Sequence, residues 1–552
     1  MNWQKINSDF QPLADRVNTP IRMASSLSNP LKLATAMAST AFPAATDAAL
    51  EMLRAGGNAI DAAMAAAWAL SVCEPSGSGL GGKTVMLIRF ADGKTTVVDG
   101  RSQGPASVSK QQVTRAQQKL GYRACSIPTT VAALGHAQRL YGVLPLAQVM
   151  EPSIRLAEEG FALTKLYCRQ LKWCQDDLRS NPASSRIFLN NGELFQVGDV
   201  FRQPILAKTL RRLAQVGTED FYSGQIARDI VSDMAQHGGL MALSDLSECV
   251  QPVQCDAMSA SYRGHQMLSV PPPGGGLQLF LALKILEQFS ADELRGDQER
   301  QYEAVGQVIQ TVFRERDSWS VTQQSLTSSM ARWMLSEERA LELFQKTNWP
   351  PSEVSAEDLA EDEEPGETTH LCTSDREGNV VSLTQSIQSL FGAKVSNGEL
   401  GFLYNNSLCT CPRREHPYQL KGRCLPRSNM APTILLRDGH PFLALGAAGS
   451  RRIISSILQV ISGVIDHQLP LTEAMSRARI HVMISGKTHL EKAAATPSLE
   501  AKLAKRFGEV RIRARRSYFM GAVQAIQFVP GGGCIGAADP RRDGNAVGIS
   551  SE

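Results

Sequence analysis

The chain has 552 residues, of which 43% are apolar and 20% are charged, so it is large and apolar enough to fold around a sizeable buried core. Its formal charge at pH 7 is only +3, which gives no electrostatic reason to expect a nucleic-acid or membrane partner. The eleven cysteines follow no framework spacing, which fits a reducing compartment better than a disulfide scaffold.

The N-terminal region carries no targeting signal that we can identify. The first twenty residues contain acidic and polar groups and no continuous apolar stretch, so we predict no secretory signal and a cytoplasmic location. The longest apolar stretch, residues 59–73, includes Asp61 and is shorter than the ~20 apolar residues that span a bilayer. We therefore expect a buried helix and no membrane partner.

Two successive helices are predicted near the N-terminus. Residues 44–55 carry apolar side chains at helical spacing and stop at Gly56-Gly57, a signal that ends helices. Asn58 then has the position of an N-cap for the buried helix. Asp61 stands at its third position, where an acidic side chain favours the first turn.

The glycine-rich segment 74–82 implies close backbone approach or unusual dihedral angles. It does not fit a phosphate-binding loop, because Lys83 lacks the required spacing and no helix follows. The sequence predicts instead a strand over 84–90 that turns at Asp92-Gly93 into a second strand over 95–98.

From about 130 to 350 the sequence predicts mainly helices separated by short polar loops. The run PPPGGG at 271–276 ends an extended segment and starts an apolar helix over 277–289. Seven acidic side chains then fall between residues 353 and 364, with almost no apolar ones. Such a run buries too little surface to offset its ordering entropy, so we expect it to be flexible.

Strand signals become frequent after Thr368. Short strands are predicted over 369–374, 380–385, 432–437 and 441–446, and a helix over about 451–465. A sheet-forming module therefore opens at a threonine. The sequence contains no internal repeats.

Three cysteines and one histidine lie close together in the sequence after this point, and they are Cys409, Cys411, Cys424 and His416. These residue types can bind zinc. The C-x-C start, however, lacks the two-to-four-residue spacer of structural zinc sites, so we favour unpaired loop cysteines over a metal site.

Six blocks spread from about residue 33 to near the C-terminus carry a resemblance to a known family. They are GGNAIDAAMAAAWALSVCEPSGSGLGG at 56–82, TTVAALGHAQRLYGVLPLAQVMEPSIRLAEEGFALT at 129–164, YRGHQMLSVPPPGGG at 262–276, TTH at 368–370, MAPT at 430–433 and GAADPRRDG at 536–544. In this order they resemble the γ-glutamyltransferase (glutathione hydrolase) family of the N-terminal-nucleophile hydrolase superfamily.

The resemblance implies a fold and a maturation step. The fold is the four-layer αββα sandwich of N-terminal-nucleophile hydrolases, an α/β (α+β) arrangement. Family members are made as one precursor that cuts itself before the first threonine of TTH, here between Glu367 and Thr368. The expected products are a large fragment, 1–367, and a small catalytic fragment, 368–552, associated as a heterodimer. The flexible acidic run is expected to make the cleaved bond mobile.

The resemblance also assigns catalytic roles. Cleavage gives Thr368 a free α-amine, whose pKa near 8 lets it accept the proton of its own hydroxyl. Thr369 is expected to hold that amine, and the Ser386 hydroxyl is expected to support the new N-terminus where the family has a threonine. Gly449 and Ser450 correspond to the glycine pair whose backbone N–H groups form the oxyanion hole. This chemistry requires neither a metal nor an organic cofactor.

The donor-binding positions are only partly retained. Arg101 corresponds to the arginine that binds the α-carboxylate of the donor, a task that suits a bidentate guanidinium. The remaining donor positions differ from the family pattern, and they are Gln388 for an asparagine, Ser407 for an acidic or amide residue, Thr410 for the aspartate that pairs with the α-ammonium, and Ser428-Asn429 for two serines. The amine side of the donor pocket is therefore altered.

These observations predict an acyltransferase or hydrolase that cleaves γ-glutamyl amide bonds of glutathione-like donors through a threonyl acyl-enzyme. Its partners are then a small-molecule amide and either water or an amine acceptor. One alternative is an amidase or acylase with the same machinery and a shifted acyl donor. A non-catalytic scaffold protein is a further alternative, against which Thr368, Thr369 and Gly449 argue.

Overall fold

The computed structural model describes residues 33–248, 251–318, 325–326, 328–346 and 366–550. They form a mixed α/β fold around two large antiparallel sheets. The first sheet has seven strands in the order β18 (Asn545–Ile549), β1 (Ala36–Thr40), β9 (Gly366–Ser374), β10 (Val380–Ser389), β2 (Lys83–Arg89), β3 (Thr95–Gly100) and β6 (Val253–Cys255). The second has six, in the order β17 (Cys534–Ala538), β16 (Ala522–Phe528), β12 (His440–Ala448), β11 (Thr433–Arg437), β8 (His265–Ser269) and β7 (Met258–Tyr262).

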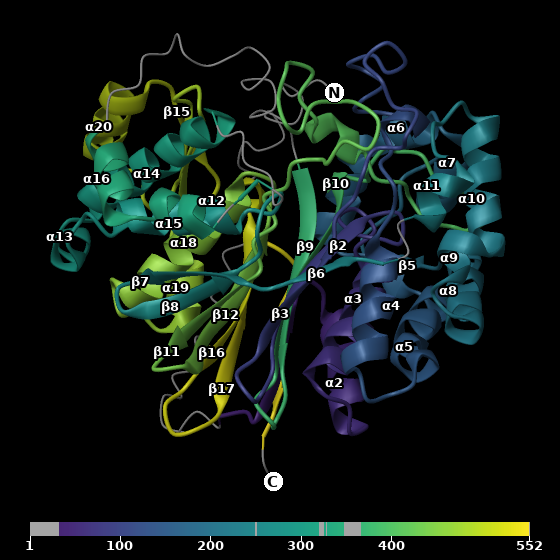
Figure 1. Ribbon diagram of the computed structural model, residues 1–552, viewed down its shortest axis with the longest axis horizontal. Helices are drawn as coiled ribbons and strands as arrows, with labels where there is room; N and C mark the ends of the chain where they lie inside the picture. Colours follow the sequence, from purple (N-terminus) through teal and green to yellow (C-terminus); the bar gives the residue numbers. More distant parts are fainter. Residues whose placement is uncertain (1–32, 249–250, 319–324, 327, 347–365, 551–552) are drawn as a thin grey trace.

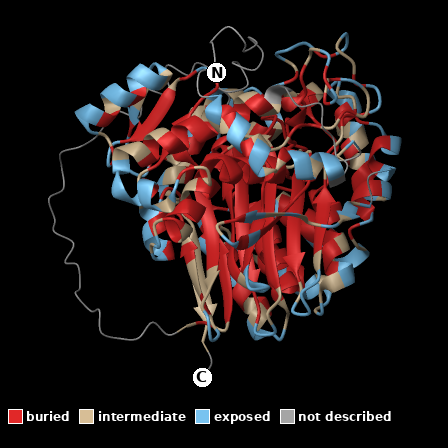
Figure 2. Cartoon of the chain, turned by 60° about the vertical axis from the view of Figure 1, so that its left-hand side comes forward, coloured by how far each residue is buried: buried red, intermediate tan, exposed pale blue. Residues whose placement is uncertain are grey.

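The two large sheets pack against each other through β9, β10 and β1 of the first sheet and β12, β16 and β17 of the second. Figure 1 shows them side by side in the middle of the molecule, with helices on both outer sides. The strands at the centre of both sheets are almost entirely buried, whereas exposed residues gather on the outer helices and loops (Figure 2). The catalytic candidate Thr368 therefore lies at the interface between the sheets.

Helices of the N-terminal half cover the first sheet. They are α2 (Pro43–Arg54), α3 (Ala59–Cys73), α4 (Thr130–Tyr141), α5 (Leu146–Glu159), α6 (Lys165–Arg179), α7 (Pro182–Phe188), α8 (Pro204–Val216), α9 (Asp220–Ser223), α10 (Gln225–Gln236) and α11 (Leu243–Ser247). Of these, α2, α3 and α4 pack directly on the strands, and α5 and α8 form a layer beyond them. The short pair β4 (Phe161–Ala162) and β5 (Val200–Phe201) lies among these helices.

A second set of helices covers the other sheet. They are α12 (Gly276–Leu286), α13 (Ala291–Gly296), α14 (Gln298–Ser318), α15 (Ser328–Met334), α16 (Glu337–Gln345), α18 (Arg452–Ile465), α19 (Leu471–Ser476) and α20 (Pro497–Phe507). Helix α18 packs on β12 and β16, and α12 packs on β7. A small sheet beside them pairs β13 (Ile480–Val482), β14 (Thr488–Glu491) and β15 (Val510–Arg513).

Local sequence signals account for the start of α3. The Asn58 side chain accepts from the backbone N–H groups of Ile60 and Asp61, and the Asp61 carboxylate accepts from the Asn58 N–H at 2.9 Å. This reciprocal capping box satisfies N–H groups that a helix start leaves unpaired. Every residue of α3 is buried, as its apolar sequence predicts. No helix among the described residues is long and apolar enough to cross a membrane.

The structure extends several predicted elements and adds others. The strand predicted over 369–374 begins at Gly366, and the strand predicted over 380–385 continues to Ser389. The helix predicted over 277–289 ends at Leu286. Three strands near the C-terminus, β16, β17 and β18, were not predicted, because their sequences lack a clear alternation of apolar and polar residues. The acidic run 353–364 lies outside the described residues.

Candidate active site

The bond predicted to be cut lies within a buried strand. Glu367 is 2% exposed and Thr368 is 4% exposed, and both belong to β9. Pairing between β9 and β10 is regular up to Gln385, opposite Thr369, and resumes at Gln388, opposite Glu367. The irregularity between these pairs is a β-bulge of the kind that reorients side chains at sites. The neighbouring strand thus holds the Glu367–Thr368 bond in place, so the expectation of a mobile bond was wrong.

Ser386, in this irregularity, contacts both sides of the bond. Its hydroxyl donates to the Glu367 carbonyl oxygen at 2.7 Å, and the Thr368 hydroxyl donates to Ser386 Oγ at 3.3 Å. The backbone N–H of Gln388 donates to the same Oγ at 2.9 Å. A continuous hydrogen-bonded path therefore runs from the predicted nucleophile through Ser386 to the carbonyl that it has to attack.

The side chain of Glu367 is held in a buried ionic cluster. Its carboxylate accepts from the Arg542 guanidinium and from the Tyr518 hydroxyl, and Arg542 also donates to the Thr368 carbonyl at 3.2 Å. Burial raises the pKa of Glu367, and Arg542 opposes this shift. The cluster fixes the backbone on both sides of the bond.

A second carboxyl, Glu74, lies 3.8 Å from Arg542 in the same cluster. Burial raises the pKa of Glu74 to about 8, Arg542 lowers it, and the nearby Glu367 raises it further. The hydroxyl of Thr369, which is completely buried, lowers the pKa of Glu74. One arginine therefore serves two buried carboxyls, and Glu74 is mostly protonated at neutral pH.

The predicted oxyanion-hole residues form the turn between β12 and α18. Gly449 has a φ of 128° and Ser450 a φ of 58°, so the serine occupies the left-handed region that favours glycine. A Cβ on Gly366 would come within 2.4 Å of the Ser450 Cβ. The turn at the start of a helix, where N–H groups are free to bind an anion, therefore lies against the strand that carries Thr368.

Arg101 is buried on the donor side. Its guanidinium donates to Asp99 Oδ2 at 2.7 Å, and both side chains are less than 10% exposed. Burial raises the pKa of Asp99, and the Arg101 charge opposes the shift. The Asp99 carboxylate therefore orients the arginine that is predicted to bind the carboxylate of the donor.

Gln388, another predicted donor-binding residue, lies beside Lys83. Gln388 has a φ of 83°, and its side-chain oxygen accepts from Lys83 Nζ at 3.2 Å. Lys83 is only 3% exposed, and burial lowers the pKa of its ammonium to about 8. No pattern in the sequence indicated that Lys83 belongs to the site.

Ser407 and Thr410 lie in a single helical turn after β10 (η3, Ser407–Thr410). The Thr410 hydroxyl donates to the Ser407 carbonyl at 3.0 Å, so the backbone already uses it. Among the described residues the completely buried Ser407 hydroxyl has no hydrogen-bond partner. Neither position supplies a negative charge for an ammonium group.

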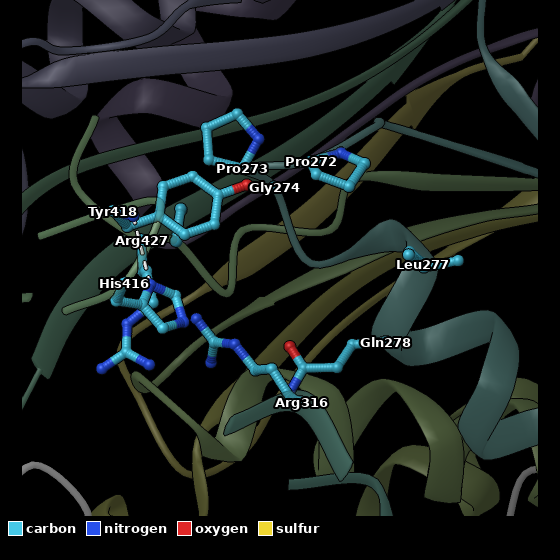
Figure 3. A pocket seen from close by; sticks show the side chains of 10 residues that line it. Pro272, Pro273, Gly274, Leu277, Gln278, Arg316, His416, Tyr418 and Arg427 are labelled. Atoms are coloured by element: carbon cyan, nitrogen blue, oxygen red, sulfur yellow. Dashed lines mark hydrogen bonds between the residues drawn. The ribbon is translucent and has the colours of Figure 1, made fainter. Parts of the chain in front are cut away.

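Ser428 lines a small cavity of about 40 Å³ next to these residues. Asn429 follows it and accepts from Arg316 at 2.5 Å. Figure 3 shows Arg316 and Gln278 reaching into the cavity from helices, opposite His416 and Tyr418. Burial raises the pKa of Tyr418 to about 12, and the positive charges of Arg316, Arg101 and Arg427 oppose this shift.

The loop cysteines do not form a recognisable metal centre. Cys411 Sγ lies 3.5 Å from Cys424 Sγ, while His416 Nδ1 accepts from the backbone N–H of Tyr418 at 3.1 Å. Within the described ranges no three His, Cys, Asp or Glu side chains are grouped as metal ligands.

Several residues of the site were missed by the sequence reasoning, and they are Lys83, Glu74, Tyr518, Arg542, Arg316 and Arg427. Arg542 and Glu74 lie inside two of the six blocks, which was the available signal for them. The other four residues carry no local pattern that separates them from surface or core residues. The contacts of Lys83, Tyr518 and Arg316 join segments that are far apart in the sequence.

Comparisons with known proteins show which family the chain belongs to. A profile of the family described as gamma-glutamyltranspeptidase matches residues 45–549. The chain is 30% identical over 541 residues to the glutathione hydrolase proenzyme of Escherichia coli (strain K12), covering 93% of this chain and 91% of that protein. It is 32% identical over 544 residues to the acylase ACY 1 proenzyme of Pseudomonas sp. (strain SE83), covering 93% of each.

Solved structures give the same result. The structure of cephalosporin acylase from Bacillus halodurans matches with a TM-score of 0.84 at 26% identity, covering 98% of this chain and 100% of that chain. The gamma-glutamyltranspeptidase of Helicobacter pylori matches with a TM-score of 0.53 at 27% identity, covering 59% of this chain and 96% of that chain. The resemblance inferred from the six blocks is confirmed: the chain is an enzyme, and it belongs to the gamma-glutamyltranspeptidase family.

Proposed function

We propose that the protein is a self-cleaving N-terminal-threonine acyltransferase or hydrolase that acts on small amide donors. The observation that carries this proposal is the hydrogen-bonded path from the Thr368 hydroxyl through Ser386 to the Glu367 carbonyl oxygen. Such a path both removes the proton of the attacking hydroxyl and stabilises the developing oxyanion.

Maturation follows from this geometry. Thr368 Oγ bonds to the Glu367 carbonyl carbon while its proton passes to Ser386 Oγ, and Ser386 passes its own proton to the developing oxyanion. The C–N bond then breaks as the proton moves from that oxygen to the Thr368 nitrogen, which leaves an ester on Oγ and a free amine on Thr368. Water hydrolyses the ester, releasing the Glu367 carboxylate and the Thr368 hydroxyl. The products are fragments 1–367 and 368–552.

We propose that the two fragments stay together and jointly form a four-layer αββα sandwich. Each large sheet takes strands from both sides of the cleavage point, since β1, β2, β3 and β6 lie in one sheet with β9, β10 and β18, and β7 and β8 lie in the other with β11, β12, β16 and β17. Separating the fragments would break the β18–β1, β1–β9 and β10–β2 pairings of the first sheet and the β11–β8 pairing of the second. A heterodimer is therefore the expected mature form.

Catalysis then uses the new N-terminus. The α-amine of Thr368 takes the hydroxyl proton, Oγ attacks the amide carbonyl of the donor, and the N–H groups of Gly449 and Ser450 stabilise the oxyanion. The amine product leaves, and water or an amine acceptor releases the acyl group from Oγ. Arg101 binds a carboxylate of the donor in this scheme.

γ-Glutamyl amides of the glutathione type are the first candidate donors, because family members such as the Escherichia coli relative are glutathione hydrolases. The second candidate is an acylase with a different acyl donor. The uncharged Ser407 and Thr410 favour this candidate, because neither offers a negative charge to an α-ammonium. A relative of similar identity is also an acylase. Both candidates require the same acyl-enzyme on Thr368.

Intact-mass spectrometry with an electrophilic glutamine analogue tests this requirement. The label is expected on the fragment that begins at Thr368, and Thr368→Ala is the matched control. Cys372 lies in the same fragment, but it is completely buried and burial raises its thiol pKa, so it should not react. A label that persists in Thr368→Ala, or that maps to Cys372, would contradict the proposed nucleophile.

A further inference from the structure

Lys83 is placed directly beside the catalytic candidates. It is the first residue of β2, and its register partner on β10 is Ser386. Directly opposed residues of an antiparallel pair project their side chains to the same face of the sheet. Ser386 in turn contacts Thr368, so the three residues form a row across adjacent strands.

The ammonium of Lys83 is buried with little to neutralise it. Its hydrogen bond to the Gln388 side-chain oxygen, at 3.2 Å, goes to a neutral group. The groups that favour its charge are Cys409, Cys411 and Asp99, and Asp99 is already paired with Arg101 at 2.7 Å. Two cations therefore share one carboxylate, which leaves a buried positive charge available for an anion.

The position of this charge bears on the choice of donor. The turn that contains Ser407 and Thr410 also contains Cys409, one of the groups that act on Lys83. An α-ammonium placed beside this turn would face Lys83 without an acidic partner from Ser407 or Thr410. A carboxylate or another acceptor placed there would instead gain a charge-assisted hydrogen bond.

We propose that Lys83 is a specificity-determining residue that repels donors with a free α-ammonium and binds a carboxylate or other acceptor on the acyl group. This inference rests on the proposed acyl-transfer function and adds the residue that selects the donor. Lys83 acts on binding, so its removal should change KM and discrimination between donors far more than kcat.

The test compares glutaryl and γ-glutamyl p-nitroanilides, which differ only in the α-ammonium. Lys83→Met should raise KM for the glutaryl donor 10- to 100-fold, change kcat less than about threefold, and improve use of the γ-glutamyl donor relative to it. Lys94→Met is the matched control, because the Lys94 side chain is 83% exposed at the far end of the same strand pair. It should leave both donors unchanged.

The pH dependence provides an independent readout. The pKa of Lys83 is lowered to about 8 by burial, so its charge is present below this pH and lost above it. KM for the glutaryl donor should therefore rise above about pH 8 in the wild type and stay flat in Lys83→Met. The conservative variant Lys83→Arg should keep the preference for the glutaryl donor.

Ligand binding separates failure of this inference from failure of the proposed function. Glutarate should raise the Tm of the matured wild type more than L-glutamate does, and this difference should vanish in Lys83→Met. The same melting curves, made with the uncleaved and cleaved forms, show whether the variant is folded. Absence of turnover with a retained glutarate effect would overturn the acyl-transfer function alone. The role of Lys83 would be overturned if Lys83→Met is active and keeps both the wild-type donor ratio and the wild-type glutarate effect. If Lys83→Met does not fold, loss of the donor preference in Lys83→Arg would overturn this role instead.

Discussion

The Ser386 hydroxyl donates to the Glu367 carbonyl oxygen at 2.7 Å, at the bulge in the pairing of β9 with β10. The donor is thus already in place at the oxygen on which negative charge develops when the bond is attacked. Because Ser386 also accepts from Thr368, one side chain links the nucleophile to its target. The sheet therefore holds together the groups that the proposed self-cleavage requires.

Ser386→Ala is expected to slow self-cleavage without unfolding the protein. Removal of one preorganised oxyanion donor costs about 10²- to 10³-fold in rate. A time course on a denaturing gel measures the conversion of the full-length chain into two fragments. Ser386→Thr keeps the hydroxyl and should cleave at close to the wild-type rate, and a Ser386→Ala protein that matures equally fast would contradict the role of this hydroxyl.

Glu74→Gln is expected to make the stability of the uncut chain less dependent on pH. The folded-state pKa of Glu74, about 8, lies above its ordinary value of 4.5. The folded state therefore binds the proton more tightly, and the stability contributed by this group is complete below pH 4.5 and lost as the pH rises to about 8. The variant should gain up to about 4 kcal/mol over the parent across this range.

Urea unfolding of the Thr368→Ala protein, with and without Glu74→Gln, measures this difference in free energy of unfolding. The Thr368→Ala background keeps the chain uncut, so the cluster around Arg542 stays intact. A stability difference that is constant between pH 5 and pH 8 would show that Glu74 does not change its protonation state in this range.

Gly366→Ala and Ser450→Gly are expected to compensate for each other. A methyl group on Gly366 would lie within 2.4 Å of the Ser450 Cβ, so the single variant should displace the strand from the oxyanion turn and slow self-cleavage. Ser450→Gly removes the obstructing Cβ, relieves a serine held at a φ of 58°, and keeps the backbone N–H.

Cleavage rates of the two single variants and the double variant form a double-mutant cycle. The double variant should cleave markedly faster than Gly366→Ala alone. Effects that simply add would show that the two residues do not interact during cleavage.

Thr410→Asp is expected to shift donor preference toward γ-glutamyl compounds. The new carboxylate can pair with an α-ammonium and with Lys83, and a charge-assisted bond of this kind is worth on the order of 2 kcal/mol, or about 30-fold. The ratio of kcat/KM for the γ-glutamyl and glutaryl anilides measures the shift. A wild-type preference for the γ-glutamyl donor of a hundredfold or more would restore the ordinary glutathione-hydrolase function.

Local chemistry explains which structural features could be predicted from the sequence. The capping box at Asn58 and the buried helix α3 follow from residue types and their spacing within one turn or one helix. The TTH block identified Thr368 as the candidate nucleophile, because contiguous residues carry its resemblance to the family. Features of this kind need no knowledge of how distant segments pair.

The contacts that distinguish the site depend on long-range pairing. Lys83 and Gln388 are 305 positions apart and meet only because β2 pairs with β10. Glu367 and Arg542 are 175 positions apart and meet at β9, the strand of the first sheet that packs on β12 and β16 of the second. Neither residue of such a pair carries a local signal of its partner, so the sequence could not predict the buried charges that surround the donor.

Intact-mass spectrometry of the purified wild-type protein after incubation at neutral pH tests self-cleavage before Thr368. Two species are expected, with masses that correspond to residues 1–367 and 368–552 and threonine at the new N-terminus, and Thr368→Ala should give a single uncut species. A folded wild-type protein that stays at the full-length mass throughout a long incubation, or that is cut at another bond, would contradict self-cleavage before Thr368.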